Sequence, residues 1–409
     1  MKDFYKATLT VGVAGTGAMG RGIVQVMVQA GCEVLLYDTF DGAAQKAKDY
    51  VSGMLVKLAE KGKLTAQQAY EMRDRMQVVT GIEAFKPCDL VIEVIIEDLK
   101  VKKEFFAKLE GAVSEDCILA TNTSSFSVTA IASACKKPGR IAGYHFFNPV
   151  PLMKVVEVIS GARTGPGVCE ALTALTRRYG HTPVNAADTP GFIVNHAGRG
   201  YGTEALKILQ EGVTEFHVLD RIMTDAAGFR LGPCELLDLT GIDVSHPVME
   251  SIYHQYYQEP RYRPSVIGQQ RKDAGLLGRK TGQGFYRHAD GKQEVFADAP
   301  APGERPASVW VSSANIDARP AVMDLLASLG ASVESGAAPS SGALIIVLPL
   351  GTDATNTAIN EGLDPARTVA LDTLLPLSKR RTLMPTIVTS LPCAPRRTGC
   401  SVRMACRSP

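Results

Sequence analysis

The chain has 409 residues, of which 45% are hydrophobic and 21% are charged. At roughly 150 residues per domain this length predicts two or three domains, and the composition excludes general disorder. The 44 basic and 42 acidic side chains leave a formal net charge of +2, which argues against nucleic acid or a membrane surface as a partner and favours a small ligand.

The first residues and the cysteines together indicate a cytoplasmic protein. The opening segment MKDFYKATLTVGVAG lacks the apolar core of a signal peptide, and no apolar run reaches the roughly 18 residues of a membrane span. Six of the nine cysteines lie singly before residue 235, without metal-ligand spacing. We therefore expect buried free thiols and no metal site.

The first half of the chain alternates strand and helix patterns. Short β-branched runs predict strands at LTVGVAG, CEVLLYD, DLVIEVI, CILATNTSS, RIAGYHFF, KVVEVIS and TPVNAAD. Several are too uniformly apolar to face water, which indicates a mainly parallel sheet between helices. Residues 40–76 form a Lys-rich insertion in which a glycine precedes Thr65, a plausible N-cap. We expect a Rossmann-type α/β domain over residues 1–188 with a helical-hairpin insertion.

The second half predicts two further parts and a tail. Helical periodicity replaces strand signals, giving an expected all-helical domain over residues 189–288, and residues 289–305 are rich in Pro, Ala and charge and are predicted to be a linker. The segments ASVWVSS, AVMDLLASLG, ALIIVLPLG and RTVALDTLL outline a small, incomplete α/β unit over residues 306–390. The basic residues 391–409 are expected to be a disordered tail.

A glycine-rich turn predicts a dinucleotide site. Gly15, Gly17 and Gly20 form G-x-G-x-x-G between an apolar strand and an apolar helix. The glycines permit a tight turn, approach of the pyrophosphate and close helix packing, and the helix N-terminus attracts the phosphates. The next strand ends at Asp38, which can bind the adenine ribose, and no Arg follows it. We therefore expect NAD in preference to NADP.

An imidazole and a carboxylate stand in an otherwise apolar stretch, YHFFNPVPLMKVVEV. If residues 140–146 and 153–159 are strands joined by the Asn-Pro-Val-Pro turn, His145 and Glu157 can meet across the connection. A carboxylate on one ring nitrogen fixes the tautomer, so the other nitrogen can take a proton. From these residues alone, a core histidine beside an unrelated strand glutamate is the alternative.

Six further segments follow one another along the chain: GTGAMGRGI, IIEDLKVKKEFF, TNTSS, HFFNPVPLMKVVEV, DTPGFIVN and GRKTGQGFY. In these segments and their order, residues 8 to about 287 resemble the 3-hydroxyacyl-CoA dehydrogenase family. The resemblance implies that His145 is the general base and Glu157 its partner. It also implies that Ser124 hydrogen-bonds the substrate 3-oxygen and that Asn195 helps orient substrate and imidazole.

The same resemblance implies the cofactor and substrate contacts. NAD is expected to contact Glu97, Lys102, Asn122, Asn148 and Lys280, while Lys61 is a candidate for the CoA phosphates. The implied reaction is NAD-dependent oxidation of a (3S)-3-hydroxyacyl-CoA to the 3-oxoacyl-CoA in fatty-acid β-oxidation or phenylacetate-type aromatic-acid catabolism. A homodimer through the helical domain is also implied.

The acyl chain stays open at the level of sequence. Residues beyond 306 resemble the middle of long bacterial members, including 3-hydroxyadipyl-CoA dehydrogenases. Those relatives continue into a second helical domain. The small α/β unit of residues 306–390 is therefore expected to be the least stable part of this chain. Arg261 and Arg263 are candidates for a far carboxylate by charge alone, and 3-hydroxybutyryl-CoA is the alternative substrate.

Other classes of protein also remain. A related dehydrogenase of free 3-hydroxy acids would need a catalytic Lys, and a crystallin-like, non-catalytic NAD-binding protein is a further alternative. A hydrolase triad is disfavoured because Ser124 lacks the G-x-S-x-G elbow.

Overall fold

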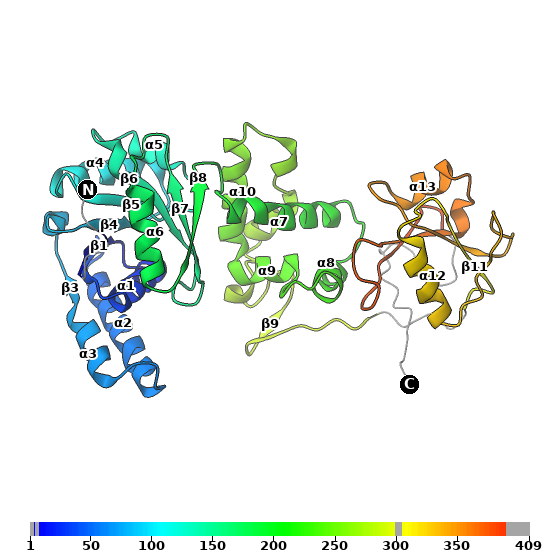
Figure 1. Ribbon diagram of the computed structural model, residues 1–409, viewed down its shortest axis with the longest axis horizontal. Coiled ribbons are helices and arrows are strands. Elements are labelled where there is room, and N and C mark those ends of the chain that lie inside the picture. The colour runs from blue at the N-terminus through cyan, green and yellow to red at the C-terminus, as the bar shows by residue number, and fades with distance from the viewer. Residues whose placement is uncertain (1–3, 5–7, 299–304, 390–409) are drawn as a thin grey trace. The chain divides into compact units, whose positions relative to one another are not determined.

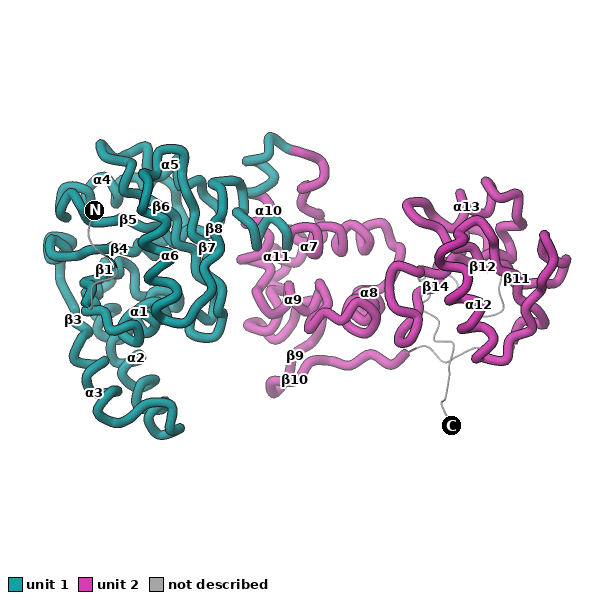
Figure 2. The backbone as a smooth tube through the Cα atoms, viewed as in Figure 1, with its two compact units in different colours: residues 1–198, 251–258 teal, residues 199–250, 259–409 magenta. Residues whose placement is uncertain are grey.

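The computed structural model describes residue 4, residues 8–298 and residues 305–389. The predicted disordered tail therefore lies outside the described residues. The chain divides into two compact units, Met1–Gly198 with Ser251–Gln258 and Arg199–Glu250 with Glu259–Pro409 (Figures 1 and 2). The boundary proposed near residue 189 stays a prediction.

The first unit is built on an eight-stranded sheet with the order β3-β2-β1-β4-β5-β6-β7-β8. All neighbouring strands are parallel except β6 and β7, which are antiparallel. This confirms the predicted mainly parallel sheet. Its strands are β1 (Thr10–Ala14), β2 (Glu33–Tyr37), β3 (Met76–Val78), β4 (Leu90–Glu93), β5 (Ile118–Thr121), β6 (Ile141–Phe146), β7 (Val155–Ser160) and β8 (Thr182–Ala187).

Helices cover both faces of this sheet (Figure 1). Buried side chains of α1 (Ala18–Gln29), α2 (Ala43–Glu60) and α6 (Val168–Arg178) join one apolar cluster, and those of α4 (Leu99–Ala112) and α5 (Val128–Ala132) join another. Because the sheet is buried on both faces, its central strands need no polar face. That is why β1, β4 and β5 read as continuous apolar runs.

The insertion after β2 is the predicted helical hairpin. Helix α2 is followed by α3 (Ala66–Asp74), whose N-cap Thr65 accepts from Gln68 N while Gln68 Oε1 accepts from Thr65 N. This capping box satisfies two helix-end donors at once. The three-residue strand β3 after the hairpin was not predicted, because it is too short to show a period.

Five α-helices follow β8 within residues 189–288: α7 (Val194–Gln210), α8 (Phe216–Arg221), α9 (Pro233–Thr240), α10 (Ile242–Gln255) and α11 (Val266–Asp273). Parts of α7 and α10 belong to the first unit and the other three helices to the second. Buried Asp238 on α9 accepts from the amides of Phe285 and Tyr286 and from His288. A Cβ on Gly284 would lie 2.0 Å from Asp238 Oδ1, so the GRKTGQGFY segment needs glycine there for this approach. The paired strands β9 (His288–Ala289) and β10 (Lys292–Gln293) replace the start of the predicted linker with a hairpin.

The predicted small α/β unit contains a four-stranded sheet in the order β11-β12-β13-β14. The first three strands are parallel and the last is antiparallel. Its elements are β11 (Val309–Val311), α12 (Arg319–Ser328), β12 (Leu344–Val347), α13 (Ala354–Asn360), β13 (Thr368–Leu371) and β14 (Leu383–Pro385). Helix α13 and strand β14 were not predicted. With this unit present, the fold class predicted from the sequence is confirmed.

The six described cysteines are free thiols. Cys32, Cys88, Cys117 and Cys234 are buried as predicted, whereas Cys135 and Cys169 are only half-buried. Burial raises the pKa of the Cys32 thiol to about 11, so it stays protonated and unreactive at neutral pH. Among the described residues, no helix combines the length and the apolar character needed to cross a membrane.

Candidate active site

The glycine turn lies between β1 and α1. Gly15 has φ +94, and a Cβ there would lie 2.4 Å from the Val94 carbonyl oxygen. A Cβ on Gly20 would lie 1.9 Å from the Gly15 carbonyl oxygen, whereas one on Gly17 would meet no described protein atom within 4 Å. Gly17 therefore borders open space at the start of α1, where a pyrophosphate can approach the backbone. The turn fits a dinucleotide.

Asp38 follows β2 and is tied to this turn. Its Oδ2 accepts from Thr16 N at 2.7 Å and from Thr16 Oγ1 at 2.8 Å, and its Oδ1 accepts from Phe40 N at 3.0 Å. Burial favours a higher pKa for Asp38, but the hydrogen bonds from Phe40 and Thr16 outweigh it and lower the pKa below its usual value. The carboxylate is therefore ionised at neutral pH, and each oxygen keeps lone pairs for a ribose hydroxyl.

His145 and Glu157 face each other across the antiparallel pair β6 and β7. They are register partners, and His145 Nδ1 lies 2.6 Å from Glu157 Oε2. The other carboxylate oxygen, Oε1, accepts from Ile193 N at 2.9 Å and from Val194 N at 2.8 Å. Both side chains are buried, Glu157 fully. The predicted pair is present, and the two amide donors at the start of α7 were missed by the sequence analysis.

These contacts set the ionisation of Glu157. Burial alone would raise the pKa of Glu157, but the hydrogen bonds from His145 and from the Val194 and Ile193 amides lower it. An ionised carboxylate accepts only, so Nδ1 of His145 carries the proton and Nε2 has the free lone pair. The rings of Phe147 and Phe192 lie 4.5 and 5.8 Å from the imidazole. The imidazole is thus held in one tautomer beside aromatic side chains.

Ser124 lies in the turn after β5. Asn195 Nδ2 on α7 donates to the Ser124 carbonyl oxygen at 3.2 Å, and Gln255 Nε2 on α10 donates to the Ser125 carbonyl oxygen at 2.6 Å. The structure therefore brings Asn195 to the backbone of Ser124. Gln255 was not singled out in the sequence, because a lone glutamine on a helix carries no distinctive signal.

Glu97 and Lys102 lie beside the same turn. Lys102 Nζ is 2.6 Å from Glu93 Oε1 and 3.1 Å from Glu97 Oε2. Glu93 is fully buried at the end of β4, and Lys102 is 1% exposed. Glu93 was not predicted from the sequence, although a carboxylate in an otherwise apolar strand is the same signal that identified Glu157.

The other predicted cofactor and CoA contacts lie as follows. Asn122 Oδ1 accepts from Phe146 N at 2.9 Å, next to His145, and Asn148 is exposed in the following turn. Lys280 belongs to the second unit and pairs with Asp243 at 2.5 Å. Lys61 is the exposed C-cap of α2. These roles stay predictions.

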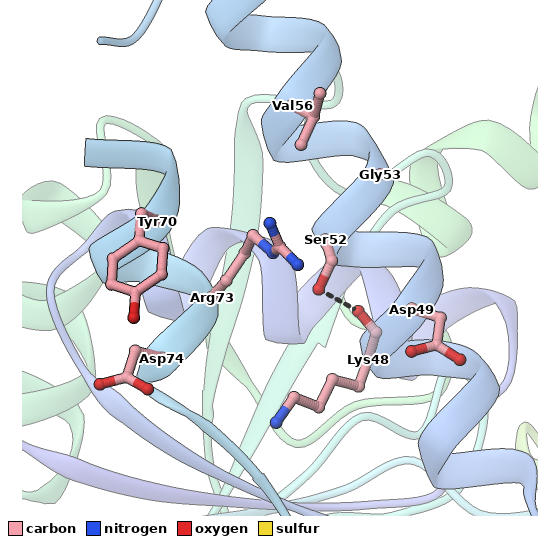
Figure 3. Close-up of a pocket in the computed structure, with 8 residues that line it drawn as sticks. All are labelled: Lys48, Asp49, Ser52, Gly53, Val56, Tyr70, Arg73 and Asp74. Carbon is pink, nitrogen blue, oxygen red and sulfur yellow. Dashed lines mark hydrogen bonds between the residues drawn. The ribbon is translucent and has the colours of Figure 1, made fainter. Parts of the chain in front are cut away.

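A hollow of about 480 Å³ lies between α2 and α3, and Lys61 is not among the residues that line it. Figure 3 shows Arg73 of α3 extending toward Ser52 of α2. The lining pairs two cations, Lys48 and Arg73, with two carboxylates, Asp49 and Asp74. Because these charges cancel, the hollow has no net attraction for phosphates.

Comparison with known proteins extends these observations. Residues 10–189 match the family model described as 3-hydroxyacyl-CoA dehydrogenase, NAD binding domain, and residues 191–288 match the one described as 3-hydroxyacyl-CoA dehydrogenase, C-terminal domain. The first match contains the glycine turn and the His145–Glu157 pair. The fold class and the predicted cofactor, NAD, agree with these matches.

Three relatives illustrate the similarity. The chain is 45% identical over 277 residues to 3-hydroxyadipyl-CoA dehydrogenase of Escherichia coli, covering 68% of this chain and 58% of that protein. It is 39% identical over 277 residues to a probable 3-hydroxybutyryl-CoA dehydrogenase of Deinococcus radiodurans, covering 68% of this chain and 99% of that protein. The crystal structure of 3-hydroxybutyryl-CoA dehydrogenase from Escherichia coli superposes with a TM-score of 0.78 at 35% identity, covering 93% of this chain and 75% of that chain.

The matched part of this chain spans 58% of the length of the Escherichia coli 3-hydroxyadipyl-CoA dehydrogenase. The Deinococcus relative is matched almost from end to end. With both domain models matched in order and this degree of identity, the chain belongs to the 3-hydroxyacyl-CoA dehydrogenase family, a family of NAD-dependent oxidoreductases.

Proposed function

We propose that the protein oxidises a (3S)-3-hydroxyacyl-CoA to the 3-oxoacyl-CoA, with His145 as the general base and Glu157 as its partner. The observation that carries this proposal is the 2.6 Å contact between His145 Nδ1 and Glu157 Oε2. Buried imidazole–carboxylate pairs of this geometry are suited to accept a proton at the opposite ring nitrogen.

His145 moves the proton. Its Nε2 accepts the proton of the substrate hydroxyl as the C3 carbon becomes a carbonyl carbon, and the imidazolium that forms is stabilised by ionised Glu157. In the reverse reaction the imidazolium returns the proton to the oxygen at C3. NAD, when bound, supplies the acceptor for the hydride that leaves C3.

Ser124 and Asn195 orient the reacting oxygen in this proposal. The Ser124 hydroxyl donates a hydrogen bond to the substrate 3-oxygen, and Asn195 supports it through the Ser124 carbonyl oxygen, 3.2 Å away. Gly17, at the start of α1, and Asp38, after β2, are the residues that would hold the pyrophosphate and the adenine ribose. Both fit that role, one through open space beside its Cα and the other through an ionised carboxylate.

The acyl group proposed is a short chain, with a dicarboxylic adipyl-type chain favoured. This rests on the higher identity to the Escherichia coli relative named as 3-hydroxyadipyl-CoA dehydrogenase, 45% against 39% for the relative named as probable 3-hydroxybutyryl-CoA dehydrogenase. The pathway proposed is accordingly aromatic-acid catabolism, with fatty-acid β-oxidation as the second candidate. Arg261 and Arg263, both exposed, stay the candidates for the far carboxylate.

A homodimer through the helical domain is also proposed. Large apolar side chains are exposed on the helical part of the second unit, among them Val213 at 54%, Phe229 at 50% and Val244 at 54%. Surfaces of this kind are commonly covered by a second subunit. Sedimentation velocity tests it, and a monomer at all micromolar concentrations would contradict it.

A substrate panel tests the proposed reaction. NADH and NADPH are each supplied with acetoacetyl-CoA, 3-oxoadipyl-CoA and the free 3-oxo acids, and oxidation is followed at 340 nm. We expect turnover of CoA thioesters with NADH and the highest kcat/KM with the dicarboxylic thioester. Turnover of free acids only would favour the free-acid dehydrogenase alternative, and NADH left unoxidised by every substrate would favour a non-catalytic NAD-binding protein.

A further inference from the structure

We infer that Glu97 is a positioning residue that fixes the Ser124 turn, and that Lys102 supports Glu97 from inside the domain. The inference rests on the proposed role of Ser124 in holding the substrate 3-oxygen. The NAD contacts that the resemblance implies for Glu97 and Lys102 stay predictions.

Glu97 gathers three donors from consecutive residues of the turn on one oxygen. Its Oε1 accepts from Thr123 Oγ1 at 2.5 Å, from Ser124 N at 3.1 Å and from Ser125 Oγ at 3.2 Å. A carboxylate with this set of bonds restrains the turn at its centre, because hydrogen bonds to an ionised acceptor are the strong ones. The backbone of Ser124, and with it the direction of its side chain, is thereby set by Glu97.

Lys102 is placed behind Glu97, away from solvent. Its side chain is 1% exposed, and its Nζ is shared between Glu93 Oε1 at 2.6 Å and Glu97 Oε2 at 3.1 Å. Glu93 in turn accepts from Thr121 Oγ1 at 2.7 Å and from Ile95 N at 2.8 Å. An ammonium group bound by both carboxylates inside the domain holds Glu97 in place.

The charge arrangement keeps Glu97 an acceptor. Burial on its own would raise the pKa of Glu97, but the Lys102 charge and the hydrogen bonds from Thr123, Lys102 and Ser124 lower it below the usual value. At neutral pH Glu97 is therefore ionised and cannot donate. Lys102 also offsets its negative charge, which would otherwise oppose charge developing on a substrate oxygen bound at Ser124.

The remaining contacts leave one group of the turn available. The carbonyl oxygens of Ser124 and Ser125 are engaged by Asn195 and Gln255. Within residues 8–298 and 305–389, no side chain or backbone group hydrogen-bonds Ser124 Oγ. The N–H and the carbonyl oxygen of Ser124 are both held by hydrogen bonds, and the Ser124 hydroxyl is left for the substrate. A substrate-binding group is expected to be held in this way by the residues around it.

A double-mutant cycle between Glu97 and Ser124 tests the inference. Glu97→Gln, Ser124→Ala and the double variant are compared by kcat for acetoacetyl-CoA reduction and by the Kd of NADH from fluorescence quenching. We expect each single substitution to lower kcat roughly 10- to 100-fold, the double variant to be within about threefold of the worse single variant, and the Kd of NADH to change less than twofold. Glu104→Gln, an exposed carboxylate on the same helix α4, is the matched control and should leave both values unchanged.

The outcomes separate this inference from the proposed function. Multiplicative losses of kcat in the double variant, or a Kd of NADH that rises as much as kcat falls in Glu97→Gln, overturn the positioning role while leaving the reaction intact. Full activity of Ser124→Ala overturns the proposed role of Ser124 and, with it, the positioning role of Glu97, while the proposed reaction stands. If Glu97→Gln does not fold, Glu97→Asp keeps the charge beside Lys102 but draws the carboxylate away from the turn. It is expected to show the same coupling to Ser124→Ala.

Discussion

His145 and Glu157 occupy paired positions on antiparallel neighbours, β6 and β7, and their side chains meet at 2.6 Å between Nδ1 and Oε2. The same carboxylate accepts the amides of Ile193 and Val194 through its other oxygen. One buried group thus orients the proposed base and anchors the first turn of α7.

Replacing His145 removes the proposed proton acceptor without removing the cofactor site. We expect His145→Gln to lower kcat by roughly 10²- to 10⁴-fold, the usual contribution of a general base, while the Kd of NADH stays within twofold. Steady-state kinetics and NADH fluorescence measure the two. His254→Gln, an exposed histidine on α10, is the control. Turnover near that of the unmodified protein would remove His145 from the mechanism.

Glu157→Gln tests the partner. An amide in place of the carboxylate must point its NH₂ either at the Ile193 and Val194 amides or at the imidazole. In the second case Nδ1 becomes the acceptor and Nε2 is protonated, so it cannot take the substrate proton. We expect kcat to fall about 10²-fold or more. Glu170→Gln, exposed on α6, should be silent. A loss under threefold would show that the pair is only structural.

The lowered pKa of Glu157 also predicts a pH dependence. Because the pKa is lower in the folded protein than the ordinary value of 4.5, the pair contributes stability that is fully present above about pH 5. That stability is lost as the pH falls through the folded pKa. The Tm difference between the parent protein and Glu157→Gln should therefore shrink between pH 6 and pH 3. A difference that is constant over this range would contradict the shift.

Asp38 is expected to set the preference for NADH. Asp38→Ala removes a candidate ribose ligand and the two hydrogen bonds from Thr16, so we expect the Kd of NADH to rise roughly 10-fold. The ratio of the NADPH Kd to the NADH Kd should fall accordingly. Asp41→Ala, an exposed aspartate three residues later, is the control. An unchanged ratio of the NADH and NADPH dissociation constants would exclude Asp38 from cofactor selection.

The buried charges around Lys102 predict a stability effect. Lys102→Met leaves Glu93 buried without its cation, and breaking a buried pair in this way costs about 3–5 kcal/mol. The double variant Lys102→Met with Glu93→Gln removes the stranded charge and should recover part of that loss. Urea unfolding measures both. A double variant no more stable than Lys102→Met would show that Glu93 is not the group left unpaired.

Trp310 offers a way to test the third unit. It is the single tryptophan of the chain, 6% exposed, and its Nε1 donates to the Gly336 carbonyl oxygen at 2.8 Å. If this unit is the least stable part, the red shift of tryptophan emission should occur at a lower urea concentration than the loss of NADH binding. Coincident transitions by both probes would contradict the expectation.

The sequence predicted what short-range patterns encode. Apolar runs predicted the strands that carry His145 and Glu157, and the glycine spacing predicted the turn before α1. The sequence did not predict hydrogen bonds between residues far apart in the chain, such as those from Gln255 to Ser125 and from the Ile193 and Val194 amides to Glu157. No local period reports such bonds. Resemblance alone predicted that Glu97 and Lys102 contact NAD, and it carried no information on which way their side chains point.

The anchoring of α7 by Glu157 bears on how this protein can be shortened. A fragment that stops at the last strand of the sheet, β8, keeps the glycine turn, Asp38 and the imidazole, yet the oxygen of Glu157 that meets Ile193 and Val194 is then stranded in an apolar site. Such a fragment is expected to still bind NAD. Its Glu157 carboxylate is expected either to become protonated or to rotate away from His145. The smallest competent piece must therefore extend past the opening turn of the helix that follows.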